Sequence, residues 1–154
     1  TLHYSCQNRG RHSSINQMIM RDKNKDFVTI CGFLSKSKRY RKSPISDLGI
    51  FIYPLVDLGY YKIFPTGFIT WTWFSDEVEK KFIKHSRSIR AEDHNSGDNF
   101  WIMDLVCLGG AKELRKLRDH NTKHFGHLTI KYARGFRKNR PIVEKKPRCL
   151  QADL

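Results

Sequence analysis

Apolar and polar positions alternate with two different periods along the chain, and these periods predict most of its elements. Apolar residues recur at helical spacing over residues 27–39. The mostly apolar segment 45–56 predicts a second helix, which Pro54 ends or kinks. Alternation over residues 60–64 and 68–74, around the turn sequence Pro-Thr-Gly, predicts a β-hairpin.

The second half of the chain continues the pattern with two helices and two strands. Ser75 is a good N-cap for a helix over residues 76–85, in which acidic residues come first and lysines last. A buried strand is expected at 100–108, a helix at 111–120 and another strand at 127–132. The order α, α, β, β, α, β, α, β indicates a single α/β domain with a mostly antiparallel sheet.

The two ends of the chain lack this periodicity. Residues 1–20 are expected to be an irregular N-terminal arm, residues 21–137 the folded domain, and residues 138–154 a basic C-terminal tail. No run of 18 apolar residues suggests a membrane span, and the first residues show no apolar core of a signal peptide. We therefore expect a soluble, cytoplasmic protein without stable membrane insertion.

The net charge of the chain indicates which kinds of partner it binds, but it says little about the fold. The formal net charge is +14 over 154 residues, which favours an anionic partner such as nucleic acid, a membrane surface or an acidic protein. The four cysteines are far apart and form no metal-ligand spacing, so neither a zinc site nor a disulfide scaffold is indicated. Dinucleotide-binding, P-loop, metalloprotease and serine-hydrolase motifs are also lacking in the sequence.

Asp104 is a candidate functional residue, because it is a charged residue among apolar neighbours. It lies inside the apolar segment 101–107, where an unpaired carboxylate costs several kcal/mol or changes its pKa. It should therefore have a partner, which can be an arginine, a histidine, a hydroxyl or backbone N–H groups. From the residues alone two interpretations stay open: a structural Asp on a half-exposed strand, or a functional acid or orienting group.

Gly109 and Gly110 follow the predicted strand directly and precede a predicted helix. A junction of this kind can present backbone N–H groups to a phosphate, and it can equally be a tight turn.

The residues before Asp104 resemble a known signature. The pattern AED-x-x-SGD-x-x-W-x-x-D over residues 91–104 resembles that of the RTX toxin-activating lysine acyltransferases, the haemolysin-activating C-protein family. The segments 44–54 and 124–126 resemble further parts of that family in the same order. The resemblance spans about residues 28–137.

The resemblance implies a GNAT-like acyltransferase fold and a reaction. Members of this family transfer a fatty acyl group from acyl-acyl carrier protein to the ε-amino groups of internal lysines in a protoxin. The acyl donor is then a phosphopantetheine thioester, and neither a tightly bound cofactor nor a metal is required. The resemblance further implies a cytoplasmic location and often a homodimer. A basic surface is consistent with acyl-acyl carrier protein as the donor, because it would attract an acidic carrier protein.

The resemblance also assigns site residues, with one departure. In the family a His within an S-x-x-H-R pattern acts with the strand Asp; here Ser37, Arg41 and Asp104 match, whereas Tyr40 occupies the His position. A Tyr with an ordinary pKa near 10 is a poor base at neutral pH. We expect Asp104 to support the site electrostatically, and Tyr40 and Ser37 to position the amine or polarise the thioester.

Other residues complete the predicted site. His94 replaces the family's Trp after AED and is a candidate for the missing imidazole. Arg41, Gly109 and Gly110 are expected to bind the phosphate of the donor. The alternative is a catalytically impaired member of the family, whose basic surface serves as a binding module for carrier protein or, less favoured, nucleic acid.

Overall fold

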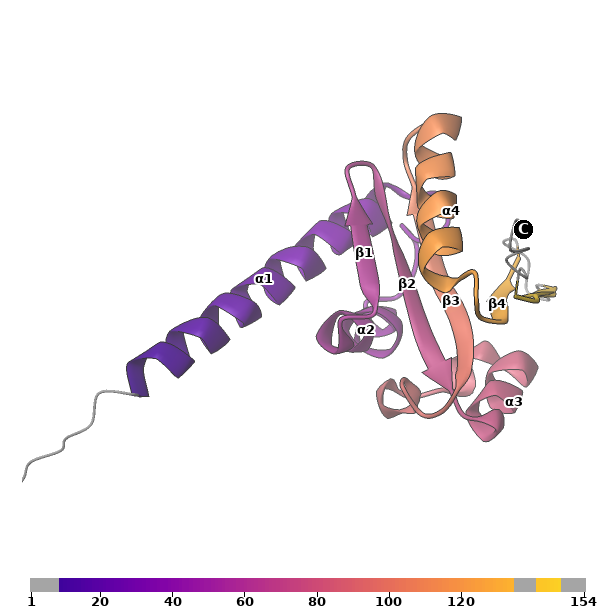
Figure 1. Cartoon of the computed structure of the whole chain (residues 1–154), viewed down its shortest axis with the longest axis horizontal. Helices are drawn as coiled ribbons and strands as arrows, with labels where there is room; N and C mark the ends of the chain where they lie inside the picture. The colour runs from indigo at the N-terminus through magenta and orange to yellow at the C-terminus, as the bar shows by residue number, and fades with distance from the viewer. Residues whose placement is uncertain (1–8, 135–140, 148–154) are drawn as a thin grey trace, which may run out of the picture.

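The computed structural model describes residues 9–134 and 141–147. These residues form a five-stranded sheet with helices packed against it (Figure 1). The strands follow one another in chain order across the sheet: β1 (Tyr61–Phe64), β2 (Gly67–Phe74), β3 (Asn99–Cys107), β4 (Ile130–Ala133) and β5 (Ile142–Lys145). Neighbours are antiparallel except β3 and β4, which are parallel and share one register pair, Trp101 with Lys131. This confirms the α/β fold with a mostly antiparallel sheet, and it is consistent with the GNAT-like fold.

Helices lie on both faces of this sheet. They are α1 (Arg9–Lys36), the π-helix η1 (Leu48–Ile52), α2 (Tyr53–Leu58), α3 (Asp76–Lys84), the 3-10 turns η2 (Ser86–Ser88) and η3 (Ala91–Asp93), and α4 (Ala111–Phe125). The N-terminal part of α1 extends away from the sheet (Figure 1). Among the described residues, no helix combines the length and the apolar character needed to cross a bilayer.

The alternation along β2 determines which helix covers which face. Phe68 packs with Ile30 of α1 and Val56 of α2 in one apolar cluster. Trp71 points to the opposite face, where its ring centroid lies 5.0 Å from that of Phe125 in α4. The hairpin, the Ser75 cap, β3 and the helix that follows it were all predicted from the sequence and are confirmed.

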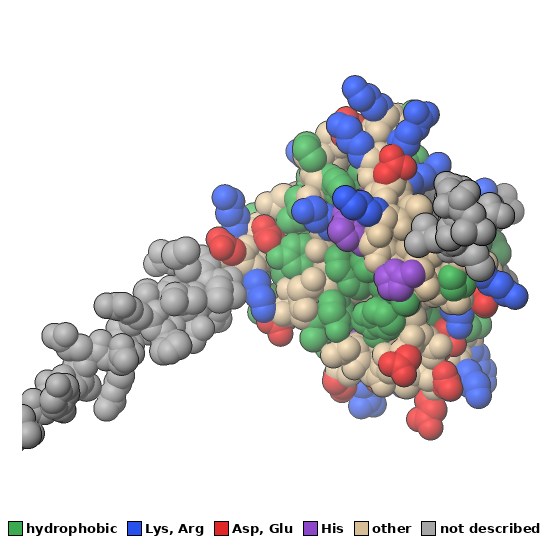
Figure 2. Space-filling model, in the orientation of Figure 1, with side chains coloured by type: hydrophobic (Ala, Val, Ile, Leu, Met, Phe, Trp, Pro, Cys, Tyr) green, Lys and Arg blue, Asp and Glu red, His purple; other side chains and the backbone are tan. Residues whose placement is uncertain are grey.

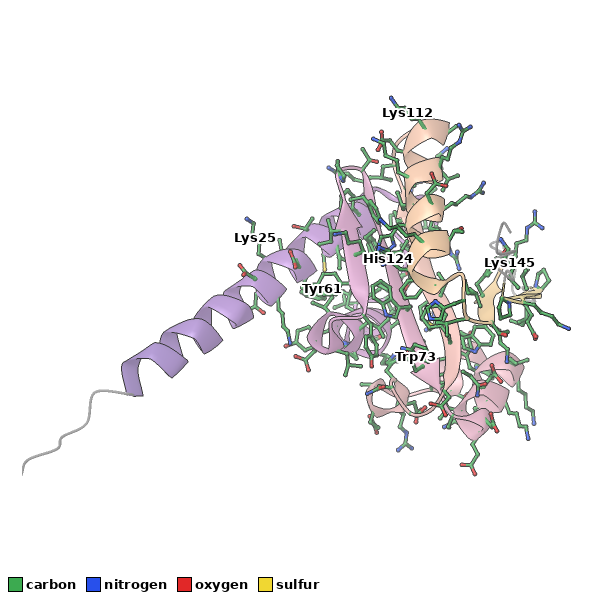
Figure 3. All side chains as sticks on the ribbon, viewed as in Figure 1. Lys25, Tyr61, Trp73, Lys112, His124 and Lys145 are labelled. Atoms are coloured by element: carbon green, nitrogen blue, oxygen red, sulfur yellow. The ribbon has the colours of Figure 1, made fainter. Side chains whose placement is uncertain are left out.

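The outer face of α4 is strongly basic. Leu117 is fully buried on its inner side, whereas Lys112, Arg115 and Lys116 are exposed. Figure 2 shows Lys and Arg side chains gathered over this helix, and Figure 3 shows Lys112 at its outer end. The chain therefore concentrates part of its positive charge on one exposed helix.

Contacts from the edge strand β1 and from α2 hold α1 in place. The Tyr61 hydroxyl donates to Asp26 over 2.5 Å, and the Lys23 ammonium donates to the carbonyl oxygen of Asp57 over 2.6 Å. Burial, followed by the hydrogen bond to Asp26, raises the pKa of Tyr61 to about 12, so it stays a neutral donor. The C-terminal half of α1 is therefore fixed to β1 and α2.

The prediction of an irregular arm at residues 1–20 is wrong for residues 9–20, because these residues belong to α1. Residues 1–8 lie outside the described part of the chain. Residues 9–20 lack an apolar stripe, so the sequence pattern predicts no helix there. A helix already formed and packed beyond residue 22 needs no such stripe to propagate backward, because each added residue gains a backbone hydrogen bond. The helix also ends earlier than residue 39, at Lys36.

Pro54 neither ends nor kinks the second helix where expected. The segment forms η1 first and then α2, with Pro54 in the first turn of α2. A proline is tolerated there because the first N–H groups of a helix have no intrahelical partner. The break in the segment therefore lies before the proline, and the helix continues past it to Leu58.

The expected basic tail at 138–154 also needs correction. Residues 142–145 form β5, which pairs antiparallel with β4, so the folded domain extends beyond residue 137. The strand is short and mostly exposed, with Glu144 and Lys145 in it, and charged residues of this kind are typical of a sheet edge. Residues 148–154 lie outside the described part. The strand expected at 127–132 begins later, at Ile130.

The loop that carries the AED and SGD signature is fastened to the start of α3. The Asp93 carboxylate accepts from the backbone N–H of Arg90 over 2.7 Å, which closes η3. The Ser96 hydroxyl accepts from the N–H of Ser75 over 2.9 Å, and the Ser96 N–H donates to the carbonyl oxygen of Trp73 over 2.8 Å. Most of this signature therefore shapes the entry to β3.

Gly97 is required in this loop by close backbone approach. A Cβ atom at Gly97 would lie 2.5 Å from Cα and 2.7 Å from N of Ser75. We expect Gly97→Ala to lower the free energy of unfolding by about 2 kcal/mol, because backbone must move to admit the methyl group. Gly32→Ala is the matched control: nothing lies within 4 Å of its Cβ, and it should stabilise α1 by roughly 0.5–1 kcal/mol. Urea unfolding distinguishes the two, and equal effects would contradict the argument.

Candidate active site

A cavity of about 810 Å³ lies where the end of α1, residues 38–48, η1 and β3 meet. Its size falls in the range typical of small-molecule sites. Much of its wall is apolar, contributed by Leu34, Ile45, Leu48, Phe51, Ile52, Phe82, Ile102 and Met103. Its polar wall and rim include Lys38, Arg39, Tyr40, Arg41, Asp47, Arg87 and Asp104. The cavity thus combines a long apolar wall with a basic rim and one buried carboxyl group.

Asp104 has the hydroxyl partners that its burial demands. The Tyr40 hydroxyl donates to Oδ1 over 2.5 Å, and the Thr70 hydroxyl donates to Oδ2 over 3.1 Å. The backbone N–H of Asp104 donates in turn to the Thr70 oxygen over 3.1 Å. The sequence-based expectation that this carboxylate has a partner is confirmed, and Tyr40 and Asp104 are brought together across 64 residues.

An irregularity in the sheet lies directly beside Asp104, which lines the cavity. Thr70 pairs with Asp104, but the next residue, Trp71, pairs with Ile102, so Met103 is an extra residue on β3. A β-bulge of this kind bends the strand locally and redirects a side chain, and bulges are frequent beside active sites. The bulge shifts the pairing of the β3 residues before Met103 by one position, while Asp104 stays opposite Thr70 and lines the cavity.

The protonation of the Tyr40–Asp104 pair is set by its surroundings. Burial raises the pKa of Asp104, and the hydrogen bonds from Tyr40 and Thr70 act against that rise. Burial, followed by the charge of Asp104, raises the pKa of Tyr40 above its ordinary value. Tyr40 therefore remains a neutral hydroxyl at physiological pH, whereas Asp104 is a better proton acceptor than an exposed carboxylate.

His94 is buried close to this pair but is bonded elsewhere. Its Nδ1 lies 3.0 Å from the Thr72 hydroxyl and its Nε2 lies 2.8 Å from the carbonyl oxygen of Ile50. Because a carbonyl only accepts, Nε2 carries the proton and Nδ1 accepts from Thr72. With both nitrogens occupied, His94 connects β2 to η1, which forms one wall of the cavity.

His94→Ala is expected to lower the free energy of unfolding by about 3 kcal/mol. The substitution leaves the Thr72 hydroxyl and the Ile50 carbonyl without their partner and opens a gap beside Phe74, whose ring stacks on the imidazole. His85→Ala, at an exposed position, should change stability by no more than about 0.5 kcal/mol. Urea unfolding at neutral pH measures both.

The same histidine gives stability a pH dependence. Burial lowers the pKa of His94, so the unfolded chain binds the proton more tightly than the folded one. Its contribution is complete above the ordinary pKa of histidine and is lost as the pH falls below it. The stability difference between the wild type and His94→Ala should therefore shrink on mild acidification. A difference that grows instead would contradict the neutral, doubly bonded imidazole.

Ser37 and Arg41 frame the turn that carries Tyr40. The Ser37 carbonyl oxygen accepts from the N–H of Tyr40 over 3.1 Å and from that of Arg41 over 3.0 Å. The Ser37 side chain is not among the cavity-lining groups, whereas the exposed Arg41 lies at the rim. The proposed role of Ser37 in positioning the amine stays a prediction.

Gly109 and Gly110 follow the C-terminal end of β3, beside the β1–β2 turn. The N–H of Leu108 donates to the Thr66 carbonyl oxygen over 2.7 Å, and Gly110 is the N-cap residue of α4. Neither glycine lines the cavity, so the structure does not bring them together with Arg41. Across the described residues, no three His, Cys, Asp or Glu side chains gather as metal ligands.

Two residues of the site were missed from the sequence. Thr70 lies within the alternating segment 68–74, and its pairing with Asp104 depends on sheet register, which the sequence does not reveal. Arg39 was passed over in favour of Arg41, although its guanidinium carbon lies 5.0 Å from the centre of the Tyr40 ring and it lines the cavity. A run of four basic or aromatic residues, 38–41, gives no indication of which one faces inward.

Comparison with known proteins gives a family match over most of the chain. The profile of the RTX toxin acyltransferase family matches residues 20–144. An uncharacterised protein of Synechocystis sp. is 28% identical over 53% of this chain and 60% of its own length. The protein-lysine myristoyltransferase RtxC of Kingella kingae is 26% identical over 62% and 64%, respectively. The RTX-I toxin-activating lysine-acyltransferase ApxIC of Actinobacillus pleuropneumoniae is 31% identical over 56% and 54%. The chain thus spans between 54% and 64% of the lengths of these relatives.

Proposed function

Because the chain belongs to the RTX toxin acyltransferase family, we propose that it is a protein-lysine acyltransferase. It moves a fatty acyl group from acyl-acyl carrier protein to the ε-amino group of internal lysines in a protoxin-like protein. The observation that carries this proposal is the part-buried Tyr40–Asp104 hydrogen bond in the wall of a partly apolar cavity. The proposal includes a cytoplasmic location.

The composition of the cavity supports a fatty acyl substrate. The apolar side chains of Leu34, Phe51, Phe82 and Met103 provide a surface on which an alkyl chain buries its area, at roughly 25 cal/mol per Å². Asp104 lies in the same wall. A chain bound along the apolar part would present its thioester carbonyl near the carboxyl group.

The hydroxyl–carboxylate pair supplies the proton transfers that the reaction needs. The neutral lysine amine attacks the thioester carbonyl carbon, forming the C–N bond. The amine proton passes to the Tyr40 oxygen while the Tyr40 proton passes to Asp104, to which it is already hydrogen-bonded. The C–S bond then breaks, and the thiolate leaves with the proton returned through Tyr40. Asp104 and Tyr40 end in their starting states, and the products are an amide and a thiol.

This relay explains how a tyrosine serves in a position where the family has a histidine. Tyr40 is never required to be an anion, because it loses and gains a proton in the same step. Burial raises the pKa of both groups, which disfavours tyrosinate and makes the carboxylate of Asp104 a stronger base. The base is therefore Asp104, reached through the hydroxyl.

A basic surface supports the proposed donor. Carrier proteins are acidic, and complementary charge accelerates encounter. The cavity rim holds Lys38, Arg41 and Arg87, of which Arg87 is ion-paired with Asp47 over 2.9 Å. Arg41 is exposed at this rim and is available to the phosphate of the phosphopantetheine arm.

Intact mass spectrometry tests the proposal. The protein is incubated with carrier protein bearing an isotopically labelled myristoyl chain and with an RTX protoxin fragment. We expect the fragment to gain the labelled chain in a hydroxylamine-resistant form, since amides survive this reagent and thioesters do not. A label found only on hydroxylamine-sensitive positions would contradict lysine acylation.

The same assay distinguishes an active acyltransferase from the alternative, a catalytically impaired binding module. A catalytically impaired member would bind carrier protein or nucleic acid through its basic surface and transfer nothing. Binding that weakens steeply with salt, without any acylated product over long incubation, would favour the binding module over the enzyme.

A further inference from the structure

Arg39 places a positive charge beside the Tyr40–Asp104 pair. It precedes Tyr40 in the turn after α1, is half-buried and lines the cavity. Its guanidinium carbon lies 5.0 Å from the centre of the Tyr40 ring, within the distance of a cation–π contact. It occupies the second unspecified position of the S-x-x-H-R pattern, whose arginine position is the exposed Arg41.

Few groups oppose the effect of burial on Asp104. Within the described residues these are the hydrogen bonds from Tyr40 and Thr70 and the charges of Arg39 and His94. Burial lowers the pKa of His94, and both of its nitrogens are bonded, so it is neutral at physiological pH. Arg39 is therefore the permanently charged group among them.

We propose that Arg39 is a positioning residue that keeps Asp104 ionised, so that the Tyr40–Asp104 pair can accept the proton of the attacking amine. This inference rests on the proposed function and adds to it a residue at a position that the S-x-x-H-R pattern leaves unspecified. A carboxyl group already carrying a proton cannot accept the one from the amine. Without a permanent cation, burial favours that protonated form.

The pH dependence of transfer tests this role. The kcat/KM of acyl transfer is measured across pH for the wild type, Arg39→Gln, Arg39→Lys and Lys42→Gln. At about pH 6, Arg39→Gln should be at least about tenfold slower than the wild type, because Asp104 becomes protonated. At about pH 9 the two should differ by less than about threefold, because the carboxyl group ionises again. Arg39→Lys keeps the charge and should keep most of the acid-side rate.

The control and a second measurement make the result decisive. Lys42 is exposed and does not line the cavity, so Lys42→Gln should follow the wild-type profile. A uniform loss at all pH values in Arg39→Gln would overturn the proposal in favour of a structural role. Infrared difference spectra against Asp104→Asn report the carboxylic acid band directly. At neutral pH the band should be strong in Arg39→Gln and weak in the wild type.

The infrared measurement also separates this inference from the proposed function. If the wild type transfers no acyl group, the proposed function fails, while the infrared titration still shows whether Arg39 controls the ionisation of Asp104. An identical band in the wild type and Arg39→Gln would overturn the inference even in an active enzyme.

Discussion

Asp104→Asn lowers the kcat of acyl transfer by about 10³-fold while the protein stays folded. The amide keeps the size of the carboxyl group, and its single oxygen can still accept from the Tyr40 hydroxyl while its NH2 group donates to the Thr70 oxygen, but it cannot take up the amine proton. The KM for the acyl donor should change little, because Asp104 acts on the proton and the apolar wall binds the chain. Steady-state kinetics with labelled donor measure both constants.

The stability of the same variant distinguishes a catalytic from a structural carboxylate. Burial raises the pKa of Asp104, so its charged form opposes folding, and that penalty disappears as the pH falls and the folded protein takes up the proton. Asp104→Asn should therefore be as stable as the wild type or more stable at neutral pH, with a gain that shrinks on acidification. A loss of stability together with activity would indicate that Asp104 holds the fold.

Tyr40→Phe should lower kcat by about 10²-fold to 10³-fold. The ring still packs beside Arg39, but the hydroxyl that connects the amine to Asp104 is gone. Tyr40→His should retain activity within about tenfold of the wild type, since an imidazole on Asp104 can also relay a proton. Single-turnover kinetics isolate the chemical step from product release.

Comparing Tyr40→Phe with Tyr40→His shows whether a group that can transfer a proton is needed at position 40. Far-ultraviolet circular dichroism should be the same for Tyr40→Phe, Tyr40→His and the wild type. An active Tyr40→Phe would show that the hydroxyl plays no part in proton transfer, and the base would have to be sought elsewhere in the cavity.

The fold was largely predictable because strong local patterns agree with it. The alternation of Ile69, Trp71 and Trp73, and the cap at Ser75, identify a hairpin and a helix without tertiary information. The errors fall where local pattern is weak. The first turns of α1 carry no apolar stripe, and β5 has only four residues, mostly exposed.

The site was predictable only in part, because its geometry depends on pairing between distant strands. Asp104 was identified from its apolar neighbours, and Tyr40 from the resemblance to the family pattern. The contribution of Thr70 depends on the register of β2 against β3, and the bulge at Met103 is invisible in the sequence. His94 illustrates the opposite case: its place in the sequence suggested an imidazole for catalysis, whereas its contacts hold η1 against β2.

The most direct test of the account is whether the wild-type protein, with Tyr40 in place, acylates lysine. Wild type and Tyr40→His are each incubated with labelled acyl-acyl carrier protein and a protoxin fragment, and products are followed by intact mass. We expect a hydroxylamine-resistant acyl group on the fragment with the wild-type protein. No transfer by the wild type, together with transfer gained in Tyr40→His, would show that the tyrosine site is inactive and contradict the account.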